Sequence, residues 1–600
     1  MWGRTLPHIC NKNDCDVTKL RIYLYRTALI LLVSLLTVAC YDYDQWQQAE
    51  EEPVDVLSHF NAEGKAWISL HISLPDNVTR TEFDDGDGAE SAIKTLKLVL
   101  FHGSSTDTEE LLTVASTYDV DYATLADVHQ QISHHTTTTL EITDSNIRNS
   151  DLLYMLALAN ASPSIAVGAT FADVKAMTLS SPTNTIGGTA YYVMTNAPLA
   201  SANDGTGSVT TLAGIDPSLL ALTEDAATAP AGYVYLERVA AKVTTKLADD
   251  LEMHIKGNAG IDFAAGDFYY SLFNFNMQSR LIRSMDATWL PYGAGDKRFV
   301  ESAKLLNNQY RTYWATDLNY DTAPEYNSMK GWKTMGENDY CAENTFDVAH
   351  MADVNSTSVL VALRLNGGNH FYTTSVTGSD VIYQMPANDV SEEGTSASET
   401  FAPRRSGKVA SAKTIDEYLR EWLMETNKDF RDWVNQYAAG EPRHVNITVE
   451  SKNENFGLTD AKVQEVTQTA RSAGSAGATA FDALDLKTYC DNNIKIKFYE
   501  NGWCYYRVLI RHFDDTQAPW SSTGTMAANT PATVYGGNEA SYLGRYGVVR
   551  NNWYSLSIHS VTHVGEPIIP LLTTAADDQV EQLLNATLQI SGWEGHEQDF

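Results

Sequence analysis

The clearest pattern in the chain is in "KAWISLHISLP", residues 65–75, where aliphatic side chains alternate with Trp, Ser and His. Successive side chains of a β-strand point to opposite faces, so this run predicts a strand with one buried face. The strand ends shortly before Arg80, which precedes the acidic, glycine-rich stretch "DDGDG". The predicted buried face carries Ala66, Ile68, Leu70, Ile72 and Leu74, and the opposite face carries Trp67, Ser69, His71 and Ser73.

Strand-like runs of the same kind recur along the chain, rich in β-branched or aromatic residues and bounded by Gly, Asn, Asp or Ser. A hairpin is predicted in "IKIKFYENGWCYYRVLIRHF", because its Asn501-Gly502 pair readily adopts the positive φ of a tight turn. The chain is therefore predicted to be mainly all-β. Other runs begin at Thr95, Leu152, Arg238, Ser358 and Asn552, and the last run has Leu584, Ala586, Leu588 and Ile590 on one face.

One segment departs from the strand pattern. In "TIDEYLREWLMETNKDFRDWVNQY", apolar residues from Ile415 to Tyr437 recur at helical spacing, which predicts one amphipathic helix near residues 414–438. Its aromatic stripe favours packing on the β-core over lining a ligand groove. The flanking stretches 389–413 and 470–480 are rich in Ser, Ala and Gly and are predicted to be loops.

The N-terminal region has the features of an export signal. Three basic residues precede the apolar run "TALILLVSLLTVAC", which has the length of a signal peptide. Its end, Thr37-Val38-Ala39-Cys40, resembles a bacterial lipobox, in which Cys40 is lipidated and becomes the first mature residue. The alternatives are an ordinary cleaved signal or an uncleaved anchor. The acidic stretch after Cys40 suits an extended tether.

Composition narrows the possible partners. The chain has 600 residues, of which 43% are hydrophobic, enough for more than one domain. With 42 basic and 76 acidic residues, its formal charge of -34 repels phosphate backbones, so nucleic acid is excluded as a partner. The cysteines beyond the tether, Cys341, Cys490 and Cys504, are odd in number and match neither a disulfide framework nor a zinc pattern.

A search for catalytic and metal-binding motifs gives no candidate site. The sequence contains no GxSxG, HExxH or P-loop motif, so no enzymatic activity and no cofactor are predicted. The stretch "DDGDGAESAI" lacks the residues that a calcium loop needs. His129, His134 and His135 cluster in a threonine-rich region, where a ligand role is the less favoured interpretation.

Several segments together resemble a family, the fimbrillins of type V pili, which includes their major fimbrial subunits. The resemblance rests on the lipoprotein leader, the strand ending near Arg80 and the acidic stretch that leads into "SAIKTLKLVLF". It continues through "YVMTNAP" from Tyr192, "YLERVAAKVTTKL" from Tyr235 and "VVRNNWYSLSIHSVTHVGEP" near the end. These segments follow the order expected of the family over nearly the whole mature chain.

The resemblance implies two transthyretin-like β-sandwich domains in tandem. The helix predicted near 414–438 and the loops beside it exceed the plainer members of the family, so they are expected to be a helical insertion in the second domain. It implies a signal peptide over 1–39, a tether and removable strand over 40–80, and domains over 81–230 and 231–575. Residues 576–600 are then a C-terminal donor segment. A surface protease specific for Arg or Lys cuts between Arg80 and Thr81 and removes the strand that contains Ile68, Leu70, Ile72 and Leu74. The strand of another subunit, containing Leu584, Ala586, Leu588 and Ile590, then fills the open groove.

The expected partners are therefore other copies of the chain, accessory pilins, the protease, the outer membrane through the lipid before cleavage, and a ligand on a host or bacterial surface. The expected location is the fimbrium, reached from an outer-membrane lipoprotein precursor. A tip or anchor subunit of the same pilus is one alternative. A monomeric surface lipoprotein that binds glycans is another, with stacking platforms from Trp46, Trp67, Trp503 and Trp553.

Overall fold

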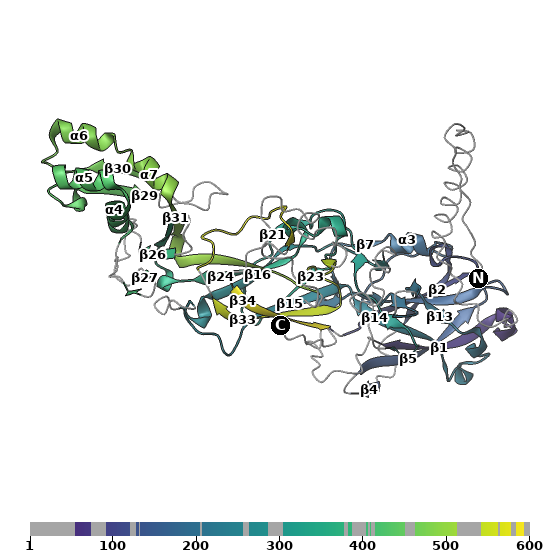
Figure 1. The fold of residues 1–600 in the computed structure, drawn as a ribbon. Helices are drawn as coiled ribbons and strands as arrows, with labels where there is room; N and C mark the ends of the chain where they lie inside the picture. The colour runs from purple at the N-terminus through teal and green to yellow at the C-terminus, as the bar shows by residue number, and fades with distance from the viewer. Residues whose placement is uncertain are drawn as a thin grey trace, which may run out of the picture. The chain divides into compact units, whose positions relative to one another are not determined.

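The computed structural model describes residues 55–73, 90, 92–120, 128–130, 133–203, 207–255, 263–285, 304–305, 307–376, 382–386, 404–405, 408–409, 414–449, 462–512, 542–561, 564–577 and 584–592. These residues lie in one compact unit, Asp55–Phe600. Most of the ribbon in Figure 1 consists of β-strands, which confirms the predicted, mainly all-β class. Among the described residues, no helix is both long and apolar enough to span a bilayer.

The N-terminal part of this unit is built around one connected set of strands. Their order is β3-β2-β6-β10-β14-β1-β5-β4, and β13 also pairs with β6. The set comprises β1 (Lys65–Ser73), β2 (Leu96–Gly103), β3 (Thr113–Val120), β4 (Val128–Gln130), β5 (Ser133–Thr143), β6 (Leu152–Ala159), β10 (Met194–Asn196), β13 (Ala213–Ile215) and β14 (Pro230–Arg238).

Strand β14 connects two parts of this sheet. Its residues 230–235 pair in parallel with β1, whereas residues 236–238 pair antiparallel with β10. The apolar faces of both parts contribute to one core, which contains Ile68, Leu98 and Val234 among its fully buried residues. The strands of this region thus enclose a hydrophobic core of their own.

The C-terminal part contains two sheets that share a second core. The first sheet has the order β23-β15-β33-β34 and the second has the order β21-β16-β24-β32, with β22 added beside β16. Inward side chains such as Val243, Tyr554, Tyr270 and Val361 come from both sheets and meet in this core. The strands are β15 (Ala240–Leu247), β16 (Phe268–Phe275), β21 (Tyr326–Met329), β22 (Lys333–Thr334), β23 (Asn338–Ala342), β24 (Ser358–Arg364), β32 (Trp503–Leu509), β33 (Asn552–Val561) and β34 (Leu584–Gly592).

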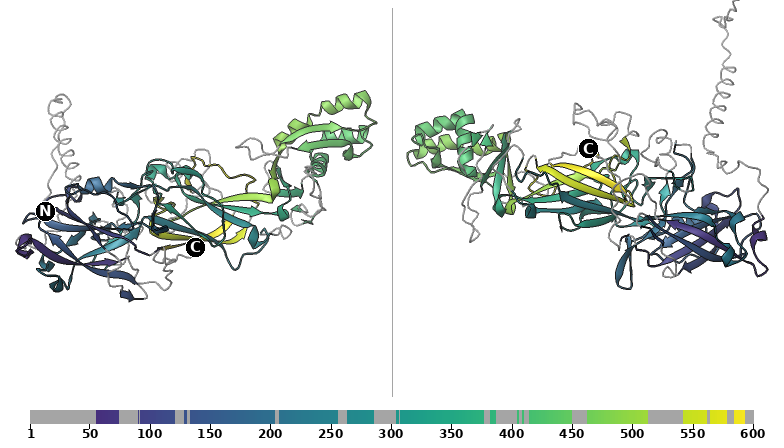
Figure 2. Two further views of the ribbon diagram at one scale, coloured as in Figure 1. Left: turned by 180° about the vertical axis from the view of Figure 1, so that it is seen from behind. Right: turned by 90° about the horizontal axis from the view of Figure 1, so that it is seen from below.

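A helical insertion between β24 and β32 has a third core. The green helices gather with β29 and β30 in Figures 1 and 2, and their buried side chains include Trp422, Phe430 and Trp433. The helical insertion was predicted in this domain. Its elements are β25 (Phe371–Val376), β26 (Ile382–Pro386), α4 (Ile415–Thr426), α5 (Lys428–Tyr437), β29 (Val445–Val449), β30 (Val463–Gln468), α6 (Gly474–Asp482), α7 (Leu486–Asn493) and β31 (Ile494–Tyr499).

The remaining strands and the helix α3 are short, and some of these strands pair a residue of the N-terminal part with a residue of the C-terminal part. They are α3 (Phe171–Lys175), β7 (Thr178–Leu179), β8 (Thr183–Ile186), β9 (Thr189–Tyr192), β11 (Leu199–Ala200), β12 (Val209–Thr210), β17 (Ser279–Arg280), β18 (Ser284–Met285), β19 (Tyr310–Arg311), β20 (Ala315–Thr316), β27 (Arg404–Arg405) and β28 (Lys408–Val409). The pairs β11-β19 and β7-β17 each link residues that are distant in sequence, such as Leu199 with Arg311 and Leu179 with Ser279.

The hairpin predicted around Asn501-Gly502 is wrong. Strand β31 pairs with β25, and β32 pairs with β24, so the two strands enter different sheets. The turn chemistry was correct, because Asn501 and Gly502 both have positive φ. Gly502 is required there, since a Cβ would lie 2.1 Å from the backbone oxygen of Leu365.

The helical prediction needs two corrections. The single helix over 414–438 is in fact α4 and α5, which meet at Asn427, whose side-chain oxygen accepts a hydrogen bond from the backbone N–H of Phe430 and caps α5. The stretch 470–480, predicted to be a loop, contains most of α6. Gly477 lets α6 approach α5 closely, because a Cβ there would lie 2.9 Å from the ring of Tyr437.

Candidate functional site

Strand β1, the strand predicted to be removed, lies between two neighbours. It runs parallel to β14, where Leu70 is opposite Gly232, and antiparallel to β5, from Lys65 opposite Thr143 to Ser73 opposite His135. Both edges of β1 are therefore used by backbone hydrogen bonds. Removal of the strand would leave a slot between β14 and β5 with an unpaired edge on each side.

The predicted buried face of β1 is confirmed for its described residues. Ile68 and Leu70 are fully buried and Ile72 is 2% exposed. On the opposite face Trp67 and His71 are half-buried, but Ser69 and Ser73 are buried as well. Leu74 lies outside the described residues. Full burial of a side chain of this size is worth about 1.5 to 3 kcal/mol, so three of them contribute a large part of the stability of a domain.

Gly232 shapes the slot opposite the middle of β1. A Cβ at this position would lie 2.6 Å from Cδ1 of Ile215 and 3.3 Å from Cδ2 of Leu70. The missing side chain on β14 therefore leaves room for both of these groups, and any strand that occupies the slot can place a large apolar residue there.

Leu70→Ala is expected to lower the free energy of unfolding by about 2 to 5 kcal/mol, because the cavity lies in a well-packed core. Chemical denaturation of the uncut protein measures this change. His71→Ala is the matched control, since its half-buried side chain faces away from the core and should cost less than about 1 kcal/mol. Equal effects of the two substitutions would contradict the assignment of the buried face.

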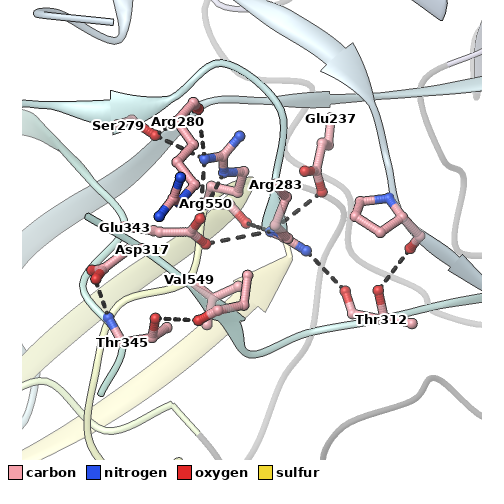
Figure 3. Close-up of polar contacts among 12 residues, drawn as sticks. Glu237, Ser279, Arg280, Arg283, Thr312, Asp317, Glu343, Thr345, Val549 and Arg550 are labelled. Carbon is pink, nitrogen blue, oxygen red and sulfur yellow. Dashed lines mark hydrogen bonds and ion pairs between the residues drawn. The ribbon is translucent and has the colours of Figure 1, made fainter. Parts of the chain in front are cut away.

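The end of β14 is fixed by a network of buried charges (Figure 3). Nη2 of Arg283 lies 3.3 Å from Oε2 of Glu237, at the end of β14, and its Nε lies 3.6 Å from Oε2 of Glu343. Nη2 of Arg550 lies 3.0 Å from Oε1 of Glu343. All four side chains are at most 2% exposed. We call these four residues the junction network, because they tie β14 to strands and loops of the C-terminal part.

Burial sets the protonation preferences around the network. It raises the pKa of Glu237, against the opposite effect of Arg283 and Arg550, and it lowers the pKa of Arg283. Beside the network, burial raises the pKa of Asp317 to about 8, although Asp317 accepts a hydrogen bond of 3.0 Å from the backbone N–H of Thr345. Such charges are tolerated in a core only when they remain paired.

Glu343→Gln is expected to destabilise the protein by about 3 to 5 kcal/mol, because Arg283 and Arg550 would stay buried without the carboxylate that both contact. Thermal and chemical denaturation test this. Glu110→Gln is the control, since Glu110 forms a half-exposed ion pair with Lys175 and should change stability by less than about 1 kcal/mol. A small effect at both positions would show that the junction network does not hold β14.

Strand β34, the predicted donor, occupies an edge. In the described residues its one ladder partner is β33, with Val561 opposite Leu584, Leu556 opposite Leu588 and Tyr554 opposite Ile590. The yellow C-terminal strand runs along its neighbour in both views of Figure 2. Both β1 and β34 have nine residues. Release of β34 therefore breaks one ladder, whereas release of β1 breaks two.

The predicted modification sites fall outside the described residues, namely Cys40, Arg80 and Thr81, and so does Trp46. The chain is described again at Glu90, whose buried carboxylate lies 3.1 Å from Nζ of Lys242 and accepts a hydrogen bond from the hydroxyl of Tyr340. Arg238 donates from its Nε to the backbone oxygen of Glu90 at 2.9 Å. The segment after the predicted cut is thus anchored at Glu90.

Sequence reasoning missed the junction network and the Glu90 anchor. Their members come from segments as far apart in the sequence as Glu237 and Arg550, and acidic and basic residues are too common in the sequence for such partners to be recognised. The only local signal is a charged residue at the end of an apolar strand, as in "YLERVAAK". Charges placed there must be paired or exposed.

The remaining candidates from the sequence are the histidine cluster and the three cysteines. Register places His129 opposite His134 and Val128 opposite His135 in the β4-β5 pair. Within the described ranges, no cluster of three His, Cys, Asp or Glu side chains could hold a metal ion. Cys341, Cys490 and Cys504 are free and buried, and burial raises the pKa of each thiol to about 12.

Comparisons with known proteins bear on this arrangement. Residues 497–599, which contain β32, β33 and β34, match the family described as "Major fimbrial subunit protein type IV, Fimbrillin, C-terminal". This match confirms the resemblance to fimbrillins that the sequence motifs indicate. A search of curated proteins found no match.

Solved structures give distant likenesses. A fimbrilin from Porphyromonas gingivalis W83 is 11% identical, with a TM-score of 0.35, over 88% of this chain and 99% of that one. A candidate cell adhesion protein from Parabacteroides distasonis ATCC 8503 is 10% identical, with a TM-score of 0.32, over 90% of this chain and 99% of that one. At these scores, neither likeness supports a conclusion about this chain.

Proposed function

We propose that this chain, which carries the fimbrillin C-terminal region in residues 497–599, is a structural subunit of a cell-surface fimbria that supports adhesion. In this proposal it is exported as a lipoprotein acylated at Cys40 and anchored in the outer membrane. A protease specific for Arg or Lys then cuts after Arg80. The cut releases β1, and β34 of another copy or of an accessory pilin takes its place.

The observation that carries the proposal is the position of β1 in its sheet. The strand is paired on both edges and buries Ile68, Leu70 and Ile72, yet it lies at the N-terminal end of the described chain, upstream of Arg80. A single cut between β1 and Glu90 would free it from the rest of the domain. An apolar slot with two open edges strongly favours the addition of another strand.

The match between β1 and β34 supports the choice of donor. Each strand has nine residues, and in each strand four apolar residues occupy alternate positions on one face. The apolar sets are Ala66, Ile68, Leu70 and Ile72 in β1, and Leu584, Ala586, Leu588 and Ile590 in β34. Because the donor strand and the slot are different parts of one chain, the contact is head-to-tail and produces a filament.

The anchors on both sides of the slot suit this scheme. The junction network holds the end of β14, and Glu90 holds the chain just after the predicted cut. The parallel wall of the slot would therefore keep its place when β1 leaves. By contrast, β5 is paired with β1 along the whole of β1 and otherwise only with the short β4 in the described chain, so it depends on the occupant of the slot.

The experiment is to determine the N-terminal residue of the protein recovered from the cell surface, together with its assembly state on a non-dissociating gel. A start at Thr81 with a ladder of multimers supports the proposal. A lipidated start at Cys40 with monomer alone contradicts a shaft role, and leaves an anchor subunit or a monomeric lipoprotein.

A further inference from the structure

A cluster of aromatic rings covers one end of the outer face of the β16-β24-β32 sheet. Tyr269 and Trp503 meet edge to face with centroids 5.9 Å apart, and Trp332 stacks on Tyr505 at 6.1 Å. Tyr269 and Tyr505 are both in register with Ala362 on the strand between them. The rings therefore share one face of the sheet. We call Tyr269, Trp332, Trp503 and Tyr505 the aromatic platform.

Core packing does not account for the platform. In the described part of the chain, the hydrophobic core clusters include none of these four rings, and the neighbouring residues Phe268 and Tyr270 point into the core instead. Trp332 is 38% exposed and the other three rings are half-buried. A tryptophan kept partly in water beside three more aromatic rings is typical of a binding surface.

A pocket adjoins the platform. It has a volume of about 390 Å³ and lies where the ends of β15, β16 and β22 meet. Its lining includes Lys246, Phe268, Tyr269, Thr334 and Met335. Tyr269 belongs to both the pocket lining and the platform, so the two adjoin at this residue. The volume is within the range of small-ligand sites.

Two basic side chains lie at the pocket and the platform. Exposed Lys246 lines the pocket, and the exposed guanidinium of Arg364 lies 5.9 Å from the centre of the Trp503 ring. No residue that lines the pocket in the described structure carries a carboxylate. Glu566, which pairs with Tyr505 through the backbone, is neutralised by Lys497 at 2.8 Å. Two exposed carboxylates remain nearby, namely Glu500 before β32 and Glu337, which accepts a hydrogen bond of 3.0 Å from the backbone N–H of Thr334.

We infer that the platform and pocket form a binding site for an oligosaccharide that contains an acidic sugar. The C–H face of a sugar ring is apolar and packs against aromatic faces, while its hydroxyl groups bond to tyrosine hydroxyls and backbone groups. Arg364 and Lys246 supply the cations that a sugar carboxylate needs. A chain with a formal charge of -34 would otherwise repel such a ligand.

This site differs from the platforms that the sequence alone suggested. Trp503 belongs to it, but Trp553 is engaged elsewhere, since its indole N–H donates to Oγ1 of Thr244 at 2.8 Å and its ring lies 4.2 Å from Nζ of Lys242. The other members are Tyr269 and Trp332, which are distant from Trp503 in the sequence, and Tyr505, which lies two residues after Trp503 on β32. The inference is independent of polymerisation, because β1 and β34 do not contribute to the site.

The test is binding of the full-length protein to a printed array of sialylated and uronic-acid oligosaccharides, each beside its neutral parent. Binding to at least one acidic glycan is expected. Trp332→Ala should weaken that binding about tenfold or more. Arg364→Gln should weaken binding of the acidic glycan about tenfold and leave its neutral parent unchanged.

Tyr326→Ala is the matched control, because Tyr326 is equally exposed, stacks on Phe275 and lies on β21 outside the platform. It should bind as the parent protein does. The inference is overturned if the protein binds no glycan, if binding survives both Trp332→Ala and Arg364→Gln, or if all three variants lose binding equally. Multimer ladders recorded for the same variants report on assembly separately and should be unchanged.

Discussion

Arg80→Ala is expected to leave the protein as an uncut, lipidated precursor that forms no multimers. Without the cut, β1 remains covalently attached and keeps both of its ladders and its buried Ile68, Leu70 and Ile72. A donor strand cannot displace it, because a linked strand has a high effective concentration in its own slot. Mass spectrometry of the N-terminus and a non-dissociating gel measure the two effects.

Arg80→Lys is the matched control, since a protease that accepts both residues should still cut and allow multimers to form. Lys65→Ala is a second control, because Lys65 is the first residue of β1 and a cut after it would leave the rest of the strand in the slot. Ladders that persist in Arg80→Ala would contradict the proposed activation step.

Truncation before Leu584 is expected to give a protein that is cut normally but does not polymerise. The shortened chain lacks β34 and has no strand to donate, while its own slot is opened by the loss of β1. Because β34 lies at the edge and pairs with β33 alone in the described chain, its removal breaks a single ladder, and the C-terminal part should stay folded. Native gels and analytical ultracentrifugation show the loss of multimers.

Truncation after Gly592 controls for shortening of the chain, since it retains all of β34. It should polymerise as the parent does. The truncated chain should also cap the ends of filaments when mixed with the parent, because it accepts a strand but donates none. Normal filaments from the chain that ends before Leu584 would show that another segment is the donor.

Local alternation allowed the strands to be predicted well. The runs that became β1, β2, β6, β24 and β33 were recognised from period-two patterns because each has one face in a core. Arg238 was predicted to begin a strand, but it is the last residue of β14. The break of one residue between β14 and β15 does not change the sequence of apolar and polar residues in a recognisable way.

Errors arose where tertiary context outweighed local signals. The backbone conformation of the Asn501-Gly502 turn was predicted correctly. The two strands that flank the turn, however, pair with β25 and β24 and not with each other. Helix α6 has few large apolar residues, so its small residues resembled a loop until their close packing against α5 was known. In the candidate site, β1 and β34 were found from sequence, while the junction network depends on pairs that only the fold brings together.

The course of β14 has a mechanical consequence. This strand lies beside β1 in parallel, ends at Arg238 and is followed after one residue by β15, which pairs in parallel with β33. Tension along a strand in the slot would load the hydrogen bonds to β14 in shear, so that many must break at once. The covalent backbone then carries the load directly into β15, without passing through a flexible linker. The chain is thus suited to bear a pull along its strands.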